Sequence, residues 1–293
     1  MSTDRAIFGT AAGMPDRSRQ EPTRLVEGQN KIKARLTTTG SVLRSSTLLI
    51  ERMQQQGELL LRGREIQGIL FDAGDTLVKP ERGSWFPGPN FESILASHGQ
   101  AAVEDKLLAP ALQQGMRYLN ANHLVTTEEE EYEQFKEYSR LVLAELNIEV
   151  AESSLAEELA GDMVYNDSKY GLYQDTLPEI KRFYEQGLML AILSDTWPSL
   201  DRVFRNFGIR DYFKVFTISS QVGCCKPDER IYRHTLNAIG LPASQLLFVD
   251  NIAENVRKAI ELGMHGILIE RYGENHQTDL DKITALAELD AYL

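Results

Sequence analysis

Short apolar runs alternate with helix-like stretches through the second half of the chain. The runs have the length and apolar composition of buried strands, and they cover residues 188–193, 214–219, 245–249 and 266–269. The helix-like stretches cover residues 199–207, 227–239 and 253–262. Strands separated by helices favour right-handed crossovers, so the pattern predicts an α/β fold built on a parallel sheet.

About a hundred residues between Leu77 and Asp175 show no strand pattern. Within residues 128–146, large apolar side chains recur at helical spacing, and they are Tyr132, Phe135, Tyr138, Val142 and Leu146. This spacing indicates an amphipathic helix with one face in a core. Near the start of the region, Phe86-Pro87-Gly88-Pro89 predicts a turn fixed by Gly and Pro, which suits a hinge, a flap or a simple connector.

Three polar side chains stand at the ends of predicted strands. Asp72 follows the apolar run 66–71, Ser194 ends a second run, and Asp250 ends a third. The carboxyl ends of parallel strands form the ligand crevice of an open α/β sheet, so we expect these side chains to converge. A lone cation, Lys226, precedes Pro227, which suits the first turn of a helix.

Each of these residues also has an ordinary structural interpretation. Asp72 and Ser194 fit turns after strands, and Lys226 fits a solvated surface charge. Asp250 and Asn251 could simply cap the helix that follows them. The functional interpretation therefore depends on the four residues together.

In this order, Asp72, Ser194, Lys226 and Asp250 resemble the four motifs of the haloacid dehalogenase-like (HAD) hydrolase superfamily, whose members are mostly phosphatases. The resemblance covers roughly residues 66–270. It implies a Rossmann-like parallel-sheet core with an inserted helical cap of the superfamily's first subclass, which closes over the active site and selects the substrate. The core would comprise residues 65–78 and 176–293, and the cap residues 79–175.

The resemblance also implies a Mg²⁺-dependent phosphatase that acts on a small phosphorylated metabolite. Asp72 would attack phosphorus and form an aspartyl-phosphate that water hydrolyses. Ser194 and Lys226 would be the other catalytic residues, and phosphate binding would involve Ser194, Asp195 and Lys226. Mg²⁺ prefers oxygen ligands, which would come from Asp72, the Gly74 carbonyl and Asp250.

Two positions depart from the superfamily pattern. Related phosphatases usually carry a second Asp two residues after the nucleophile, as general acid and then general base, but this chain has Gly74 there. Such proton transfer is typically worth about a hundredfold to ten-thousandfold in rate. Asp75 lies one residue later, and Asn251 stands where many relatives have another Asp; both are candidates for an accessory role.

Two alternatives stay open. A 2-haloacid dehalogenase uses the same carboxylate to displace halide from carbon without a metal, and it too lacks the second Asp. Such enzymes usually have an aromatic residue at that position and an arginine just inside the cap; Gly74 does not match, and Arg82 is a loose candidate for the arginine. The other alternative is a phosphate-binding regulatory protein that has lost turnover, which Gly74 would suit.

Composition limits the class of protein further. A chain of 293 residues with 42% hydrophobic content can form one core domain with an inserted partner. Its two cysteines, Cys224 and Cys225, are adjacent and cannot form an ordinary loop-closing disulfide, which favours a reducing cytoplasm. No run approaches the roughly 18 apolar residues typical of a spanning helix, so we expect a cytoplasmic protein without a membrane partner.

Charge is distributed unevenly along the chain. Residues 1–64 contain 11 Lys or Arg against 6 Asp or Glu, a net charge of +5, which leaves −17 for the rest of a chain whose net charge is −12. The acidic remainder argues against nucleic acid as a partner. We expect residues 1–64 to be a partly flexible N-terminal extension, helix-like over residues 45–64. The sequence leaves the oligomeric state open.

Overall fold

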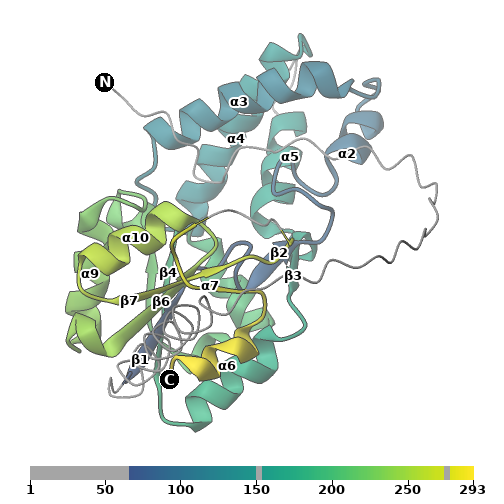
Figure 1. Ribbon diagram of the computed structural model, residues 1–293. Coiled ribbons are helices and arrows are strands. Elements are labelled where there is room, and N and C mark those ends of the chain that lie inside the picture. Colours follow the sequence, from purple (N-terminus) through teal and green to yellow (C-terminus); the bar gives the residue numbers. More distant parts are fainter. Residues whose placement is uncertain (1–65, 150–153, 274–277) are drawn as a thin grey trace, which may run out of the picture. The chain divides into compact units, whose positions relative to one another are not determined.

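A six-stranded parallel sheet forms the centre of the α/β core (Figure 1). The computed structural model describes residues 66–149, 154–273 and 278–293. Within these ranges the strand order is β5-β4-β1-β6-β7-β8, and every neighbouring pair is parallel. The strands are β1 (Gly68–Phe71), β4 (Met189–Ser194), β5 (Phe213–Ile218), β6 (Leu246–Asp250), β7 (His265–Ile269) and β8 (Lys282–Ile283). The predicted α/β fold with a Rossmann-like parallel sheet is confirmed.

Helices cover both faces of this sheet. Helices α6 (Thr176–Glu185) and α7 (Ser199–Asn206) pack on one face, and α9 (Glu229–Ile239) and α10 (Ala253–Glu261) pack on the other. A short helix, α8 (Ser219–Val222), follows β5 directly. Each helix connects parallel strands, which is the arrangement that buries both faces of a sheet.

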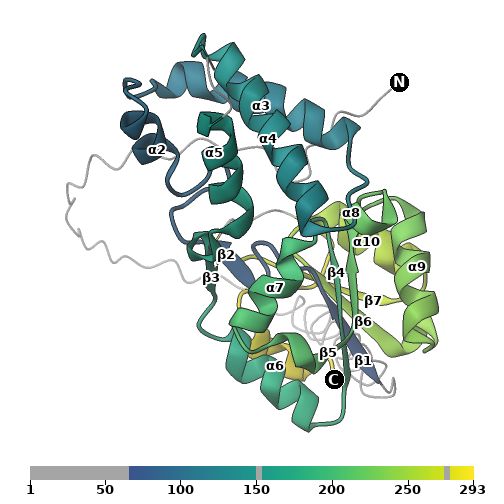
Figure 2. The ribbon, with the colours of Figure 1, turned by 180° about the vertical axis from the view of Figure 1, so that it is seen from behind.

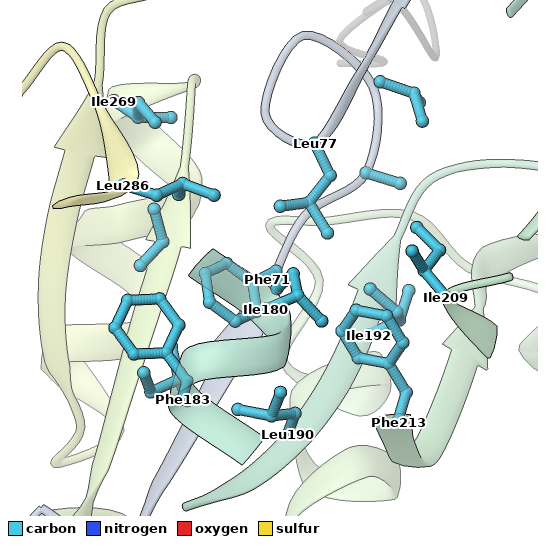
Figure 3. Packing of buried hydrophobic residues seen from close by; sticks show 14 of the residues in the cluster. Phe71, Leu77, Ile180, Phe183, Leu190, Ile192, Ile209, Phe213, Ile269 and Leu286 are labelled. Atoms are coloured by element: carbon cyan, nitrogen blue, oxygen red, sulfur yellow. The ribbon is translucent and has the colours of Figure 1, made fainter. Parts of the chain in front are cut away.

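Strand β1 buries successive side chains on opposite faces of the sheet. Ile69 and Phe71 belong to the hydrophobic cluster under α6, and Leu70 belongs to the cluster under α9. Figure 3 shows Phe71 beside Ile180 and Phe183 of α6 in the first cluster. Because neither face meets solvent, such a strand is a continuous apolar run rather than an alternating one.

In the sequence, four helices of the described residues lie between β2 (Val78–Pro80) and β3 (Tyr170–Leu172), and they group together beside the sheet (Figure 2). They are α2 (Phe91–Ser97), α3 (Asp105–Ala121), α4 (Glu128–Glu145) and α5 (Ser154–Tyr165), together called here the helical insertion. The insertion has a hydrophobic cluster of its own, which also includes Trp197 from the core. The two short strands, β2 and β3, pair antiparallel where the chain enters and leaves it.

Helix α4 illustrates why the predicted amphipathic helix forms. Thr127 caps it, since its hydroxyl accepts the Glu130 N–H at 3.2 Å, and four glutamates occupy the first turn, where negative charge favours a helix. Phe135, Tyr138 and Val142 are all buried, as their spacing predicts. The sequence-based prediction of a helix over residues 128–146 is confirmed to within one residue.

Several local predictions are wrong. The helix expected from Pro227 begins at Glu229, because the Asp228 carboxylate caps it by accepting the Arg230 N–H at 2.9 Å. Strands β2 and β3, of three residues each, fall where no strand pattern was expected. The two-residue strand β8 was also not predicted. Strands this short are stabilised by pairing with a partner strand, and they are too short to show a periodic pattern of apolar residues in the sequence.

The predicted N-terminal extension, residues 1–64, lies outside the described residues, as does its helix-like stretch, residues 45–64. Among the helices that the structure describes, none has the length and apolar content to cross a membrane.

Packing between α3 and α4 depends on a glycine, which gives a testable prediction. A Cβ atom at Gly115 would lie 2.4 Å from Cε2 of the buried Tyr138 ring and 2.9 Å from a Val142 methyl group. We expect Gly115→Ala to lower the free energy of unfolding by about 1–3 kcal/mol through overpacking. Denaturant unfolding monitored by circular dichroism measures this change.

Gly161, inside α5, is the matched control, because an added Cβ meets no atom within 4 Å. Gly161→Ala should raise the free energy of unfolding by up to about 1 kcal/mol, since alanine favours a helix interior. Equal stabilisation by both substitutions would contradict the packing argument.

Candidate active site

Three neighbouring strands bring their polar ends together at one edge of the sheet. Asp72 directly follows β1, and β1 lies between β4, which ends in Ser194, and β6, which ends in Asp250. The Ser194 hydroxyl donates a hydrogen bond to Asp72 Oδ1 at 3.0 Å. The convergence expected from the strand ends is therefore present in the structure.

Lys226 lies between the two carboxylates. Its Nζ donates to Asp72 Oδ1 at 2.7 Å and to Asp250 Oδ2 at 2.6 Å, and its side chain is only 1% exposed. Burial disfavours the charged ammonium, but the carboxylates of Asp250 and Asp72 outweigh this effect and hold the pKa of Lys226 well above its usual range. The alternative interpretation of Lys226 as a solvated surface charge is wrong.

Three groups donate hydrogen bonds to the Asp250 carboxylate. Besides Lys226, the Ile252 N–H donates to Oδ1 at 2.7 Å and the Asn255 side-chain amide donates to Oδ2 at 3.1 Å. Burial raises the pKa of Asp250 to about 6, against the opposing effect of Lys226. Asn255, in the first turns of α10, was missed at the sequence level. Asn251 is half-buried, and the amide that contacts Asp250 is that of Asn255 instead.

Asp195 ties the end of β4 to the Lys226 segment. Its Oδ1 accepts the Lys226 backbone N–H at 3.0 Å, and the residue is buried. Burial raises the pKa of Asp195 to about 7, and the Lys226 ammonium only partly offsets this effect. A protonated carboxyl at this position could donate a hydrogen bond to a phosphate oxygen, whereas a carboxylate would repel it.

The turn after Asp72 places Gly74 and Asp75 in different surroundings. Gly74 lines the cavity of the site and pairs with Val78 in an isolated bridge. Asp75 has a positive φ of 56°, which Asp tolerates better than most residues. Its carboxylate accepts hydrogen bonds from Trp85 Nε1 at 3.2 Å and from the Tyr272 hydroxyl at 2.9 Å.

Gly74 and Ser194 belong to a cavity that extends from the strand ends to the helical insertion. Its empty volume is about 450 Å³, part of it open to solvent. The lining residues are Ala73, Gly74, Val78, Trp85, Phe86, Glu131, Phe135, Met163, Lys169, Tyr170, Ser194, Asp195, Thr196, Trp197 and Leu200. Trp85 and Phe86 come from the turn predicted around Phe86-Pro87-Gly88-Pro89, which follows β2 and leads to α2.

Two charged residues on the cavity lining were not recognised in the sequence. Glu131, from α4, accepts both the backbone N–H and the hydroxyl of Ser199, at 2.8 and 2.7 Å, and thereby joins the insertion to α7. Burial raises the pKa of Glu131 to about 7. Lys169 donates to the Met163 carbonyl, and burial lowers the pKa of Lys169 to about 8. No spacing in the sequence distinguishes either residue from surface charges.

The model of the haloacid dehalogenase-like hydrolase family matches residues 66–263. This is more than half of the chain, so the chain belongs to the haloacid dehalogenase-like hydrolases, as its motifs indicated.

Relatives with different activities resemble parts of the chain. It is 34% identical over 123 residues to an (S)-2-haloacid dehalogenase of Pseudomonas sp. (strain YL). The matched region covers 39% of this chain and 52% of that protein. It is 31% identical over 118 residues to a phosphoserine phosphatase of Thermus thermophilus. That match covers 40% of this chain and 47% of the phosphatase. The chain thus spans about half the length of these relatives.

Solved structures agree in fold. The 2-haloacid dehalogenase from Pseudomonas syringae pv. Tomato DC3000 superimposes with a TM-score of 0.58 at 18% identity, covering 78% of this chain and 97% of that one. At this identity the likeness concerns the fold alone.

The raised pKa of Asp195 predicts a pH-dependent stability. The folded state holds a proton on this carboxyl up to a pKa of about 7, whereas the ordinary value of 3.8 applies once the chain unfolds. The folded state therefore binds more protons between about pH 4 and 7, so this group's contribution to the free energy of unfolding falls as pH rises through that window. Asp195→Asn removes the titration and retains an oxygen that can accept the Lys226 N–H.

We expect Asp195→Asn to match the wild type in stability near pH 4 to 5 and to exceed it at pH 8. Chemical denaturation at each pH, in chelator, makes the comparison. A variant less stable than the wild type at pH 8 would show that Asp195 is stabilised as a carboxylate.

Proposed function

We propose that this hydrolase is a Mg²⁺-dependent phosphomonoesterase that acts on a small phosphorylated metabolite. The observation that carries the proposal is the buried cluster in which Lys226 bridges Asp72 and Asp250 while Ser194 donates to Asp72. A nucleophilic carboxylate, a fixed cation and a hydroxyl donor within hydrogen-bonding distance are the groups that an attack on phosphorus requires.

Neutralisation of charge is the first requirement. A carboxylate and a phosphate repel each other at close range unless positive charge lies between or beside them. Lys226 supplies one such charge at a buried position, where electrostatic interactions are stronger than in water. Its high pKa keeps it protonated at any pH that the enzyme meets.

Oxygen atoms near Lys226 are the proposed ligands of a magnesium ion. Mg²⁺ takes one or two carboxylates together with substrate phosphate and keeps several waters. The donors proposed here are Asp72, Asp250 and the Gly74 carbonyl. Within the described residues, no group of three or more His, Cys, Asp and Glu side chains could hold a metal, which argues against an all-protein cage. When bound, Mg²⁺ would neutralise phosphate charge during the reaction.

The proposed reaction proceeds in two displacements on phosphorus. Asp72 attacks through a carboxylate oxygen, the bond from phosphorus to the ester oxygen breaks, and an aspartyl-phosphate forms. Water then attacks that phosphorus and releases phosphate, which restores the Asp72 carboxylate. Ser194 holds Asp72 in place before attack and would donate to a phosphate oxygen. Gly74 provides no proton for the departing alkoxide.

A 2-haloacid dehalogenase is the second candidate. The absence of a second Asp at position 74 and the partial identity to the Pseudomonas dehalogenase favour it, but Gly74 is not the aromatic residue usual at that position. The arginine that such an enzyme would need is not supplied by Arg82, which is exposed and donates to the Pro89 carbonyl at 2.5 Å. A phosphate-binding protein without turnover is a third candidate, which also rests on Gly74.

One panel distinguishes these functions. Phosphorylated metabolites and 2-haloacids are incubated with the protein in Mg²⁺ or in chelator, and released phosphate or halide is measured. We expect phosphate release in Mg²⁺, its loss in chelator and its recovery when Mg²⁺ returns. Asp72→Asn, which keeps the shape but is a poor nucleophile, should retain less than about a tenth of the rate.

Halide release that persists in chelator would establish the dehalogenase instead. Phosphate binding without turnover in any condition would favour the regulatory protein.

Gly74 predicts a dependence on the leaving group. Without a side-chain acid, poor leaving groups should suffer most, so an aryl phosphate should be cleaved much faster than an alkyl phosphate. Gly74 is not among the described residues with positive φ, so an Asp there meets no left-handed strain. Gly74→Asp should therefore speed alkyl substrates and narrow the gap.

Rates are compared for a series of phosphates that differ in leaving-group pKa. If chemistry limits the rate and turnover does not vary along the series, another residue donates the proton and the argument fails.

A further inference from the structure

The cavity has a polar end and an aromatic side. At the polar end it is bounded by Ser194, Asp195 and Thr196, beside Asp72. Five aromatic residues of the lining form what is called here the aromatic wall: Trp85, Phe86, Phe135, Tyr170 and Trp197. A group esterified to a phosphoryl group at the polar end and directed into this cavity would contact the wall.

Rings of the aromatic wall come from separate elements and contact one another. Trp85 precedes the helical insertion in the sequence and Tyr170 follows it, and the centroids of their rings lie 5.4 Å apart. Phe135 of α4 and Trp197 of the core have centroids 5.1 Å apart, and Phe86 lies 6.3 Å from Phe135. These distances lie within the roughly 4.5–7 Å range of favourable ring pairs, so a further flat ring fits the same kind of packing.

The indole N–H groups of the wall are already engaged by protein partners. Trp85 Nε1 donates to Asp75 Oδ2 at 3.2 Å, and Trp197 Nε1 donates to Gln134 Oε1 at 2.6 Å. Both indoles therefore present carbon surfaces to a ligand rather than donors.

Besides Asp195, the lining contains the charged residues Glu131 and Lys169, and both are engaged as well. Glu131 uses both carboxylate oxygens to accept from Ser199. Lys169 donates to the Met163 carbonyl and lies 5.0 Å from the centroid of the Tyr170 ring. Among the carboxylates near Lys169, Glu131 contributes most to stabilising its charged form. Each substrate hydroxyl buried here without a partner would weaken binding roughly 5- to 150-fold.

We propose that the cavity selects phosphomonoesters of flat, apolar, aromatic alcohols and discriminates against polyhydroxylated ones. This inference rests on the phosphatase function proposed above, and it specifies the substrate class. Apolar surface buried against the wall favours the aromatic group. The indole N–H groups, Glu131 and Lys169 are engaged elsewhere, so sugar-like hydroxyls against the wall lack these partners.

Both tryptophans of the chain, Trp85 and Trp197, belong to the wall, so intrinsic fluorescence reports ligand binding directly. Titration with 3-phenylpropylphosphonate and with 3,4-dihydroxybutylphosphonate, in Mg²⁺, compares two ligands that cannot be hydrolysed. We expect the phenyl compound to bind at least about tenfold more tightly, the lower end of the range that apolar pockets give.

Turnover is measured with 2-phenylethyl phosphate and glycerol 1-phosphate, which are both primary alkyl esters, so their leaving oxygens are similar in acidity. The ratio of their kcat/KM values should also be at least about tenfold in favour of the phenyl ester. Phe86→Leu should reduce this ratio severalfold. Tyr165→Leu is the matched control, because Tyr165 is an exposed aromatic residue that stacks on Tyr132 outside the cavity. The ratio of kcat/KM values in this variant should equal that of the wild type.

The two proposals can fail separately. Preferential binding of the phenyl phosphonate without turnover of either ester supports the inference and overturns the phosphatase function. Turnover with equal kcat/KM values supports the phosphatase and overturns the inference. Equal binding of the two phosphonates, binding of neither, or equal ratios in the Phe86 and Tyr165 variants also overturns it.

Discussion

The ammonium of Lys226, held between two buried carboxylates, constrains the whole site. Lys226 Nζ lies 2.7 Å from Asp72 Oδ1 and 2.6 Å from Asp250 Oδ2, and these two carboxylates outweigh the effect of burial on the pKa of Lys226. Removing one partner of such a cluster typically costs about 3–5 kcal/mol, because an uncompensated charge is left behind. The cluster forms only if β1 lies beside β6 and if the segment after α8 returns over their ends.

This constraint explains why the polar residues at the sheet edge support one another. The Asp195 carboxyl accepts from the Lys226 backbone, and Asn255 and the Ile252 N–H hold Asp250. The same interactions fix where Lys226 Nζ lies relative to Asp72. Rigid positioning of a cation beside a nucleophile is the form of preorganisation that speeds displacement on phosphorus.

Strand ends were predictable from the sequence because each apolar run stops at a polar residue. Asp72, Ser194 and Asp250 are found this way, and the resemblance to known motifs adds Lys226, which no strand marks. Long buried strands and α4 leave strong periodic signals. Short strands such as β2 and β3 do not, since tertiary pairing alone defines them.

Tertiary contacts also decide which charged residues line the cavity. Glu131 sits among glutamates that face solvent, and only its bonds to Ser199, 68 positions away, distinguish it. Lys169 is comparable, since its neighbours Glu131 and Met163 come from α4 and α5. Partners this distant in the chain cannot be predicted from the sequence around a residue. The helix that contains Glu131 was predicted because its pattern lies within consecutive residues.

The turn after Asp72 links this residue, the proposed nucleophile, to the aromatic wall of the cavity. Arg271 fixes that turn by donating twice to the Thr76 carbonyl, at 3.0 and 2.7 Å. Asp75, in its left-handed conformation, then holds the indole of Trp85. A carboxylate near the nucleophile is therefore present, but it orients an aromatic side chain instead of lining the cavity as Gly74 does. Movement of this turn would shift Asp72 and Trp85 together, so nucleophile position and substrate fit are coupled through a few residues.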